Sequence, residues 1–178
     1  NGNLDTCPAA GDTVVFDGTS SKDVTVDAGF AGTIAVVQMN TGYSGTITLA
    51  RSFTVTSTFT QSAGIFNGSN QTMGVTGTFT LNSGASFTST SGTLTLSGSA
   101  TINSAATFNN NGGIVTFAGT GTVTWACGNK TFNSVVINRT ASGVNSATVG
   151  SDCTLPLGAN PTVNLGTQGT FNINGTLS

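Results

Sequence analysis

Apolar and polar residues alternate along most of the chain, and between residues 71 and 124 the alternation itself repeats with a fixed period. Successive units read QTMGVTGTFTLNSGASFTSTS, GTLTLSGSATINSAATFNNNG and GIVTFAGTGTVTW. Equivalent apolar positions lie 21 residues apart (94 − 73 = 21; 115 − 94 = 21) and form three columns: Met73, Leu94 and Val115; Leu81, Ile102 and Val123; Phe87 and Phe108. A polar column accompanies them, made of Thr80, Thr101 and Thr122. A fixed period of this length is the signature of a solenoid.

The two-residue alternation inside each unit is typical of strands with one buried and one solvated face. Gly, Ser and Asn separate three such runs per unit, and these residues tolerate tight corners. We therefore predict an all-β fold, a right-handed parallel β-helix with about 21 residues per coil, whose strands stack ~4.8 Å apart. The apolar columns become internal ladders and the threonine column an external one. A pilin-like β-sandwich is the alternative, but a sandwich has no reason to keep the period.

Residues 1–30 differ from the rest, because they contain five of the six acidic residues and no regular period. We interpret them as irregular first coils, or as a cap whose negative charge blunts an exposed strand edge. Residues 31–178 then form the solenoid, which is most regular at 71–124. Calcium binding is the alternative, since carboxylate oxygens suit this ion. Its candidate ligands are Asp12, Asp17, Asp23 and Asp27. They follow no regular ligand spacing, which favours the cap.

The chain contains three cysteines, and an odd count in a secreted protein suggests one intramolecular pair and one unpaired residue. Cys127 and Cys153 are 26 residues apart (153 − 127 = 26), close to one coil, so stacking would bring them within bonding distance. We predict this disulfide, with Cys7 free or bonded between subunits. The alternative is that all three are small buried residues. Metal binding by the cysteines is not expected, because the chain has no His and no CxxC motif.

Composition narrows the possible partners. Charged residues make up 6% of the chain, against about 25% in ordinary domains. A net charge of −2 and scattered basic residues provide no patch for phosphate, so no nucleic-acid partner is expected. The chain also lacks an uninterrupted apolar run long enough to span a bilayer.

The sequence does not predict an enzyme or a cofactor. It has no His and no Glu, and Asp152 is the only acidic residue after Asp27. General acid–base catalysis would therefore lack its usual groups. Rows of hydroxyls without a neighbouring base are not activated nucleophiles. We accordingly assign no catalytic residues.

The threonine columns allow two interpretations. A flat Thr-x-Thr array on a β-solenoid resembles the face of ice-binding proteins, which makes ice binding one alternative function. Threonine is also an ordinary exposed strand residue, and stacked hydroxyls pair across strands. Ser and Gly interrupt the array, which favours the ordinary interpretation.

Several Asn-x-Ser/Thr sequences fit acceptors for N-glycosylation on a surface protein. Their asparagines are Asn67, Asn70, Asn129, Asn138 and Asn174. In a chain this rich in Asn, Ser and Thr, several such sequences arise by chance.

Longer motifs resemble the β-strand-repeat surface proteins of bacteria. They are GTITLARSFTVTSTFTQSAGIFN, GTFTLNSGASFTSTSGTLTLSG and GIVTFAGTGTVTWACGNKTFNSVVIN, and the likeness extends over residues 11–178. The resemblance rests on the style of the repeat. It implies a secreted, adhesin-like parallel β-helix with a structural or adhesive role, and it brings no catalytic residues.

We therefore expect a secreted or cell-surface structural protein that stacks head to tail with copies of itself. The final stretch GTFNINGTL is a strand pattern without a charged or helical terminator, and an uncapped strand edge invites pairing with another chain. A head-to-tail contact that does not close generates a fibre. An adhesin or glycan-binding module, with glycans or host surfaces as partners, is the alternative.

Overall fold

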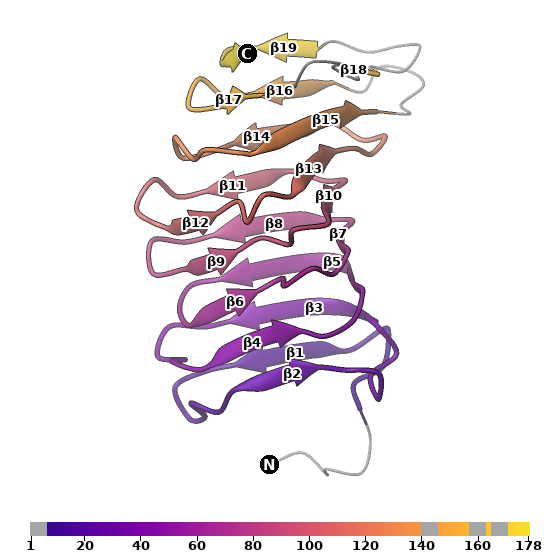
Figure 1. Cartoon of the computed structure of the whole chain (residues 1–178), viewed down its shortest axis with the longest axis vertical. Helices are drawn as coiled ribbons and strands as arrows, with labels where there is room; N and C mark the ends of the chain where they lie inside the picture. The colour runs from indigo at the N-terminus through magenta and orange to yellow at the C-terminus, as the bar shows by residue number, and fades with distance from the viewer. Residues whose placement is uncertain (1–6, 140–145, 157–162, 165–170) are drawn as a thin grey trace.

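The structure is a computed structural model that describes residues 7–139, 146–156, 163–164 and 171–178. The described residues form strands and no helix, and every pair of these strands is parallel. About seven turns stack into a β-solenoid (Figure 1). In Figure 1 the front strands β2 (Val24–Val26) and β4 (Thr46–Leu49) run to the right, while β1 (Thr13–Phe16) and β3 (Thr33–Met39) run to the left behind them. Because the chain rises as it winds this way, the coil is right-handed. The predicted parallel β-helix is confirmed.

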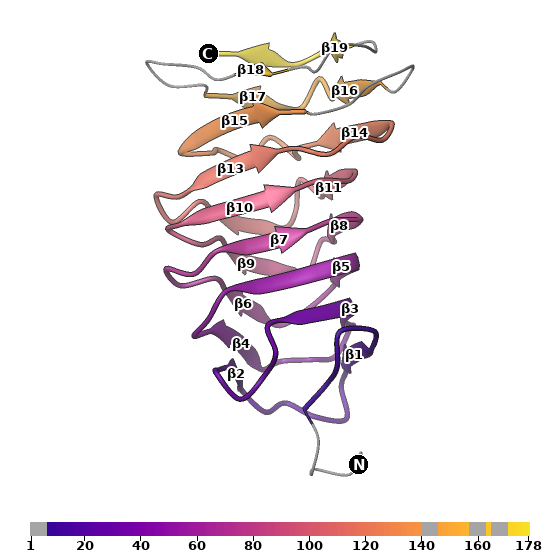
Figure 2. The same cartoon turned by 90° about the vertical axis from the view of Figure 1, so that its right-hand side faces the viewer.

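Three sides make up each coil, and we name them first, second and third in chain order (Figure 2). The first side consists of β7 (Met73–Val75), β10 (Thr93–Leu96), β13 (Ile114–Phe117), β15 (Ser134–Asn138) and β18 (Val163–Asn164). The second side consists of β8 (Thr78–Leu81), β11 (Ala100–Ile102), β14 (Val123–Ala126), β16 (Ala147–Val149) and β19 (Phe171–Ile173), with β1 below them. The third side consists of β2, β4, β6 (Ile65–Asn67), β9 (Ser86–Thr88) and β12 (Thr107–Asn109). Higher up, β17 (Thr154–Leu155) pairs with β20 (Thr176–Leu177).

Two long strands join the first and second sides. β5 (Phe53–Gln61) pairs with β7 through residues 53–55 and with β8 through residues 58–61. β3 lies below it, with a register shift between Ile34 and Val36. A shift of this kind bends a strand. Each later coil has two separate strands in place of one long strand. The long strands β3 and β5 therefore join the first and second sides into one continuous sheet.

Most of the predicted columns are confirmed. Met73 pairs with Leu94, and Leu94 pairs with Val115. The pairs Leu81–Ile102, Phe87–Phe108 and Thr80–Thr101 also form as predicted. The aliphatic members are buried, and the alternating threonines point outward.

Val123 and Thr122 do not occupy their predicted places. β14 pairs with β11 so that Trp125 lies on Ala100 and Ala126 lies on Thr101. The corner that precedes β14 is four residues longer than the corner before β11, since eight positions separate Phe117 from Trp125 where four separate Leu96 from Ala100. An even insertion keeps apolar residues facing inward, so Val123 remains buried although it stacks on Ala147.

Stacked aromatic rings form the centre of the core. The ring centroids of Phe59 and Phe79 are 5.3 Å apart, and those of Phe66 and Phe87 are 5.0 Å apart. Phe108 continues the second row at 5.9 Å from Phe87. Such ring pairs add stabilisation beyond the area that they bury. Side chains of one coil are therefore covered by equivalent side chains of the next.

Replacing Phe87 with Ala should lower the free energy of unfolding by about 3–5 kcal/mol, because the cavity interrupts the ring stack on both sides. Thr88→Ala, on the outer face of the same strand, should stay within about 0.5 kcal/mol of the parent protein. Urea denaturation followed by circular dichroism measures both. Equal effects of the two substitutions would contradict the assignment of Phe87 to the inner face of β9 and Thr88 to its outer face.

Gly98→Ala should destabilise the fold by about 1–3 kcal/mol, because the added methyl group collides with the carbonyl oxygen of Gly77 in the coil below. Gly121→Ala is the matched control, since an added Cβ there meets nothing within 4 Å. Thermal unfolding compares them. If Gly121→Ala proved the more damaging, the close approach of coils at Gly98 would be refuted.

Candidate functional site at the N-terminal end of the solenoid

In the described part of the chain, the apolar side chains of the first coil are covered on one side only. Val14, Phe16, Val24, Val26 and Phe30 pack against the core but are only partly buried. Equivalent inward residues of the next coil are covered almost completely. They are Val37, Met39, Ile47 and Leu49, each at most 3% exposed. An apolar cavity of about 190 Å³ lies among the first-coil residues, and Cys7 and Pro8 also line it.

The same end exposes strand edges. The carbonyl oxygen of Phe16 accepts a hydrogen bond from Asn40 N (2.7 Å), and that of Val26 accepts one from Ala50 N (2.9 Å). Successive residues in a strand direct their backbone groups to opposite edges. The backbone N–H and C=O groups of Val15 and Thr25 therefore point away from the second coil. Within the described residues, β1 pairs only with β3 and β2 only with β4.

The segment interpreted as an acidic cap thus contains two strands in regular parallel register with the second coil. Its carboxylates mostly serve local turns. Asp12 accepts from Ala9 N, Asp27 from Gly29 N, and Asp23 from Thr46 N at 2.8 Å. The side-chain and backbone hydrogen bonds from Thr19 lower the pKa of Asp17. That the negative charge of these aspartates prevents pairing at the exposed strand edge stays a prediction.

The calcium candidates are not assembled into a site. Asp12, Asp17, Asp23 and Asp27 each bond to a different partner, and the described residues contain no group of three or more metal-ligating side chains. The four aspartates are therefore close in sequence, but their carboxylates do not converge on one point in the structure. Asp12 and Asp17 flank β1, and Asp23 and Asp27 flank β2, so the four side chains come from the ends of two different strands.

Tyr43 connects the first coil to the second. Its hydroxyl donates to the carbonyl oxygen of Lys22 at 2.8 Å, and its ring lies 5.3 Å from that of Phe16. Burial, and then the negative charge of Asp23, raise the pKa of the Tyr43 hydroxyl. The hydroxyl therefore remains a hydrogen-bond donor at neutral pH, which helps to hold the end coil in place.

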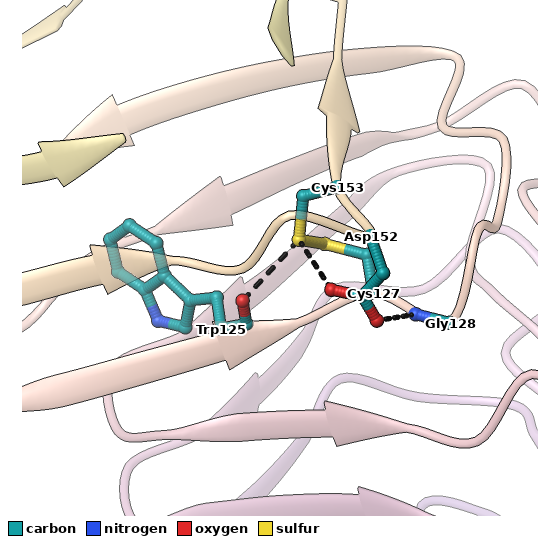
Figure 3. The surroundings of a disulfide bond; sticks show 5 residues. All are labelled: Trp125, Cys127, Gly128, Asp152 and Cys153. Carbon is teal, nitrogen blue, oxygen red and sulfur yellow. Dashed lines mark hydrogen bonds between the residues drawn. A yellow bond between two sulfur atoms is a disulfide. The ribbon is translucent and has the colours of Figure 1, made fainter. Parts of the chain in front are cut away.

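The predicted disulfide between Cys127 and Cys153 is confirmed, with a Cα–Cα distance of 4.9 Å (Figure 3). Cys127 follows β14 and Cys153 precedes β17, so the bond joins two consecutive coils. Asp152 accepts a hydrogen bond from Gly128 N at 2.6 Å beside it, and Cys153 Sγ lies 3.3 Å from the carbonyl oxygen of Trp125 (Figure 3). Cys7 is free and exposed.

Removing this bond with Cys127→Ala and Cys153→Ala together should cost about 3.5 kcal/mol, because a loop of 26 residues is no longer constrained in the unfolded chain. Cys7→Ala is the control and should leave stability unchanged. Denaturation with and without a reducing agent measures the effect. If the reducing agent left the unfolding midpoint of the parent protein unchanged, the assignment of the Cys127–Cys153 disulfide would be contradicted.

Arg139 is a buried cation that sequence reasoning did not identify. Its side chain is 2% exposed, Nη2 donates to the carbonyl oxygen of Gly121 at 2.6 Å, and the guanidinium carbon lies 6.0 Å from the Trp125 ring centroid. Among the described residues, Nη1 has no hydrogen-bond partner. Burial lowers the pKa of the guanidinium group. Gly121, which accepts the hydrogen bond from Arg139, lies in the same long corner that shifts β14. No periodic pattern in the sequence indicates a corner of this length.

The glycosylation candidates lie at several places on the solenoid. Asn70, Asn129 and Asn174 are exposed outside the strands, and Asn138 is exposed at the end of β15. Asn67 is partly buried and accepts a hydrogen bond from Ser69 N at 2.9 Å. Thr140, which completes the sequence of Asn138, lies outside the described residues. Glycosylation at all five stays a prediction.

Comparison with protein families, curated proteins and solved structures finds no match for this chain. In the part of the chain that the structure describes, no helix is long and apolar enough to cross a membrane. The candidate site is therefore chosen from the geometry of the described residues. It is the open N-terminal end, which we define by the inward residues of the first coil and the free edges of β1 and β2.

Proposed function

We propose that this protein is an extracellular structural subunit that forms a surface filament by end-to-end stacking of β-solenoids. The observation that carries the proposal is the open end described above. Its apolar side chains and free backbone groups are those that another coil would cover, as each coil covers its neighbour inside the solenoid. An extended segment that adds to a free strand edge gains main-chain hydrogen bonds.

At the opposite end, the last described strands also leave an apolar side chain exposed. β17 and β20 form the last described pair on that side of the chain, with Leu155 buried beneath Leu177, which is 37% exposed. Contact between this end of one subunit and the N-terminal end of another is heterologous, because the two surfaces differ. Such a contact repeats without closing and produces a fibre.

Two further features support the proposal. The low charge limits repulsion between stacked subunits. The Cys127–Cys153 bond suits an oxidising compartment outside the cytosol.

A glycan-binding adhesin is less well supported by the surface. Sugar rings commonly pack on exposed aromatic side chains. The large hydrophobic side chains that are exposed in the described residues are instead aliphatic, namely Val15, Ile65, Ile114 and Leu177. The surface therefore favours a structural role over recognition of glycans by ring stacking.

Thr25→Pro tests the joint, because proline removes the backbone N–H that faces the open edge and blunts strand addition. Thr25→Ala keeps this N–H and is the matched control. Negative-stain microscopy at neutral pH should show fibres for the parent and for Thr25→Ala, and single particles for Thr25→Pro. Circular dichroism checks that both variants are folded. Monodisperse parent protein, or fibres formed equally by folded Thr25→Pro, would refute the proposal.

A further inference from the structure

The second side carries a regular array of hydroxyl groups. Thr58 of β5 pairs with Thr78 of β8, and Thr60 pairs with Thr80, which pairs with Thr101 of β11. These residues alternate with the buried Phe59, Phe79 and Ala100, so their side chains point outward. The array therefore has two columns, each built from consecutive coils.

The corrected register of β14 extends one column. With Trp125 on Ala100, Thr124 lies above Ser99, and Thr124 N donates to Ser99 Oγ at 3.1 Å. Thr148 of β16 pairs with Thr124 in the next coil. The column then runs through hydroxyl-bearing residues in five successive coils: Thr58, Thr78, Ser99, Thr124 and Thr148. The 21-residue period conceals this continuity, because it places Thr120 rather than Thr124 on Ser99.

The array has a fixed geometry. Neighbouring coils lie ~4.8 Å apart, and residues two apart in a strand lie about 6.6 Å apart. The hydroxyls of Thr58, Thr60, Thr78, Thr80 and Thr101 form no hydrogen bond within the described protein. The outward residues described on strands β8, β11, β14 and β16 are uncharged. Water is therefore the natural partner of these hydroxyls, and a rigid sheet holds it in a repeating pattern.

We propose that this surface of the second side, defined by the two threonine columns, binds ice. Its repeat along the stack is close to the shorter oxygen spacing on a prism face of hexagonal ice, and its repeat along the strand approaches the longer one. Waters held by the hydroxyls would therefore be ordered in a pattern similar to that of the crystal. Charged side chains, which order water around themselves in other geometries, do not interrupt this surface.

The other two sides are less regular. On the first side, the outward columns include Gly74 of β7 and Ile114 of β13 among their threonines. On the third side, they include Ile65 and Asn67 of β6. Ice binding does not depend on filament formation, since one subunit already contains five coils of the longer column. A filament would lengthen the array, but the two proposals fail separately.

The test uses the full chain, with the monomeric fraction isolated by size exclusion. Thermal hysteresis and ice-crystal shape are measured for the parent, for Thr80→Tyr and for Thr88→Tyr. Thr80→Tyr places a bulky ring in the array, and Thr88→Tyr places the same ring on the third side. The parent and Thr88→Tyr should show hysteresis and faceted crystals, and Thr80→Tyr should lose both. Circular dichroism melting confirms that each variant is folded.

Three outcomes would overturn the proposal: no hysteresis or crystal shaping by the parent, unchanged activity in folded Thr80→Tyr, or equal loss in Thr88→Tyr. Binding of the parent to crystalline cellulose without any effect on ice would likewise assign the surface to a polysaccharide instead. Because the measurement uses monomer, fibres seen or missing in the microscope do not change its result.

Discussion

The structure depends on one constraint, which is that a single coil cannot bury its own apolar side chains. Each coil encloses a layer only one side chain thick, and only the coils above and below can cover that layer. The stacked pairs Phe59–Phe79 and Phe66–Phe87 show the result in the middle of the chain, where burial is nearly complete. The first coil shows the opposite case, because Val24 and Val26 are paired on one side only among the residues that the structure describes.

The same constraint links the fold to both proposed activities. Coverage from coil to coil requires parallel strands in register, and that register aligns equivalent residues along the axis. Inside, the alignment produces ladders of apolar side chains, and the described ladder residues of the first coil are only partly buried. Outside, it produces columns such as Thr60, Thr80 and Thr101. The proposed filament would use the ends of the stack and the proposed ice binding its flank, so neither surface would obstruct the other.

The sequence was sufficient to predict the fold class, the inward ladders of residues 71–117 and the Cys127–Cys153 bond. These predictions succeeded because corners of constant length make spacing in sequence proportional to height in the stack. Val123 and Thr122 were placed wrongly where a corner lengthens, since the alternation of apolar residues is preserved by an even insertion and gives no warning.

Other features had no signal in a single sequence. The burial of Arg139 depends on a carbonyl group in the long corner at Gly121, and backbone acceptors leave no trace in residue type. The four aspartates at residues 12–27 suggested a common ligand set. Three of them serve local turns, and Asp23 accepts a hydrogen bond from the next coil. Residues 1–30 were interpreted from their charge as irregular coils or a cap, whereas the free backbone groups at Val15 and Thr25 required the hydrogen bonds of the neighbouring strands.

The coil-to-coil register is tested most directly by disulfide trapping between the second-side strands. In a Cys7→Ser background, Ser99→Cys with Thr124→Cys places two thiols on adjacent coils, as the pairing of Ala100 with Trp125 requires. Ser99→Cys with Thr120→Cys represents the uninterrupted 21-residue period instead. Mild oxidation followed by peptide mass spectrometry should find a 99–124 cross-link in the first variant and no 99–120 cross-link in the second. A 99–120 cross-link without a 99–124 one would contradict the account.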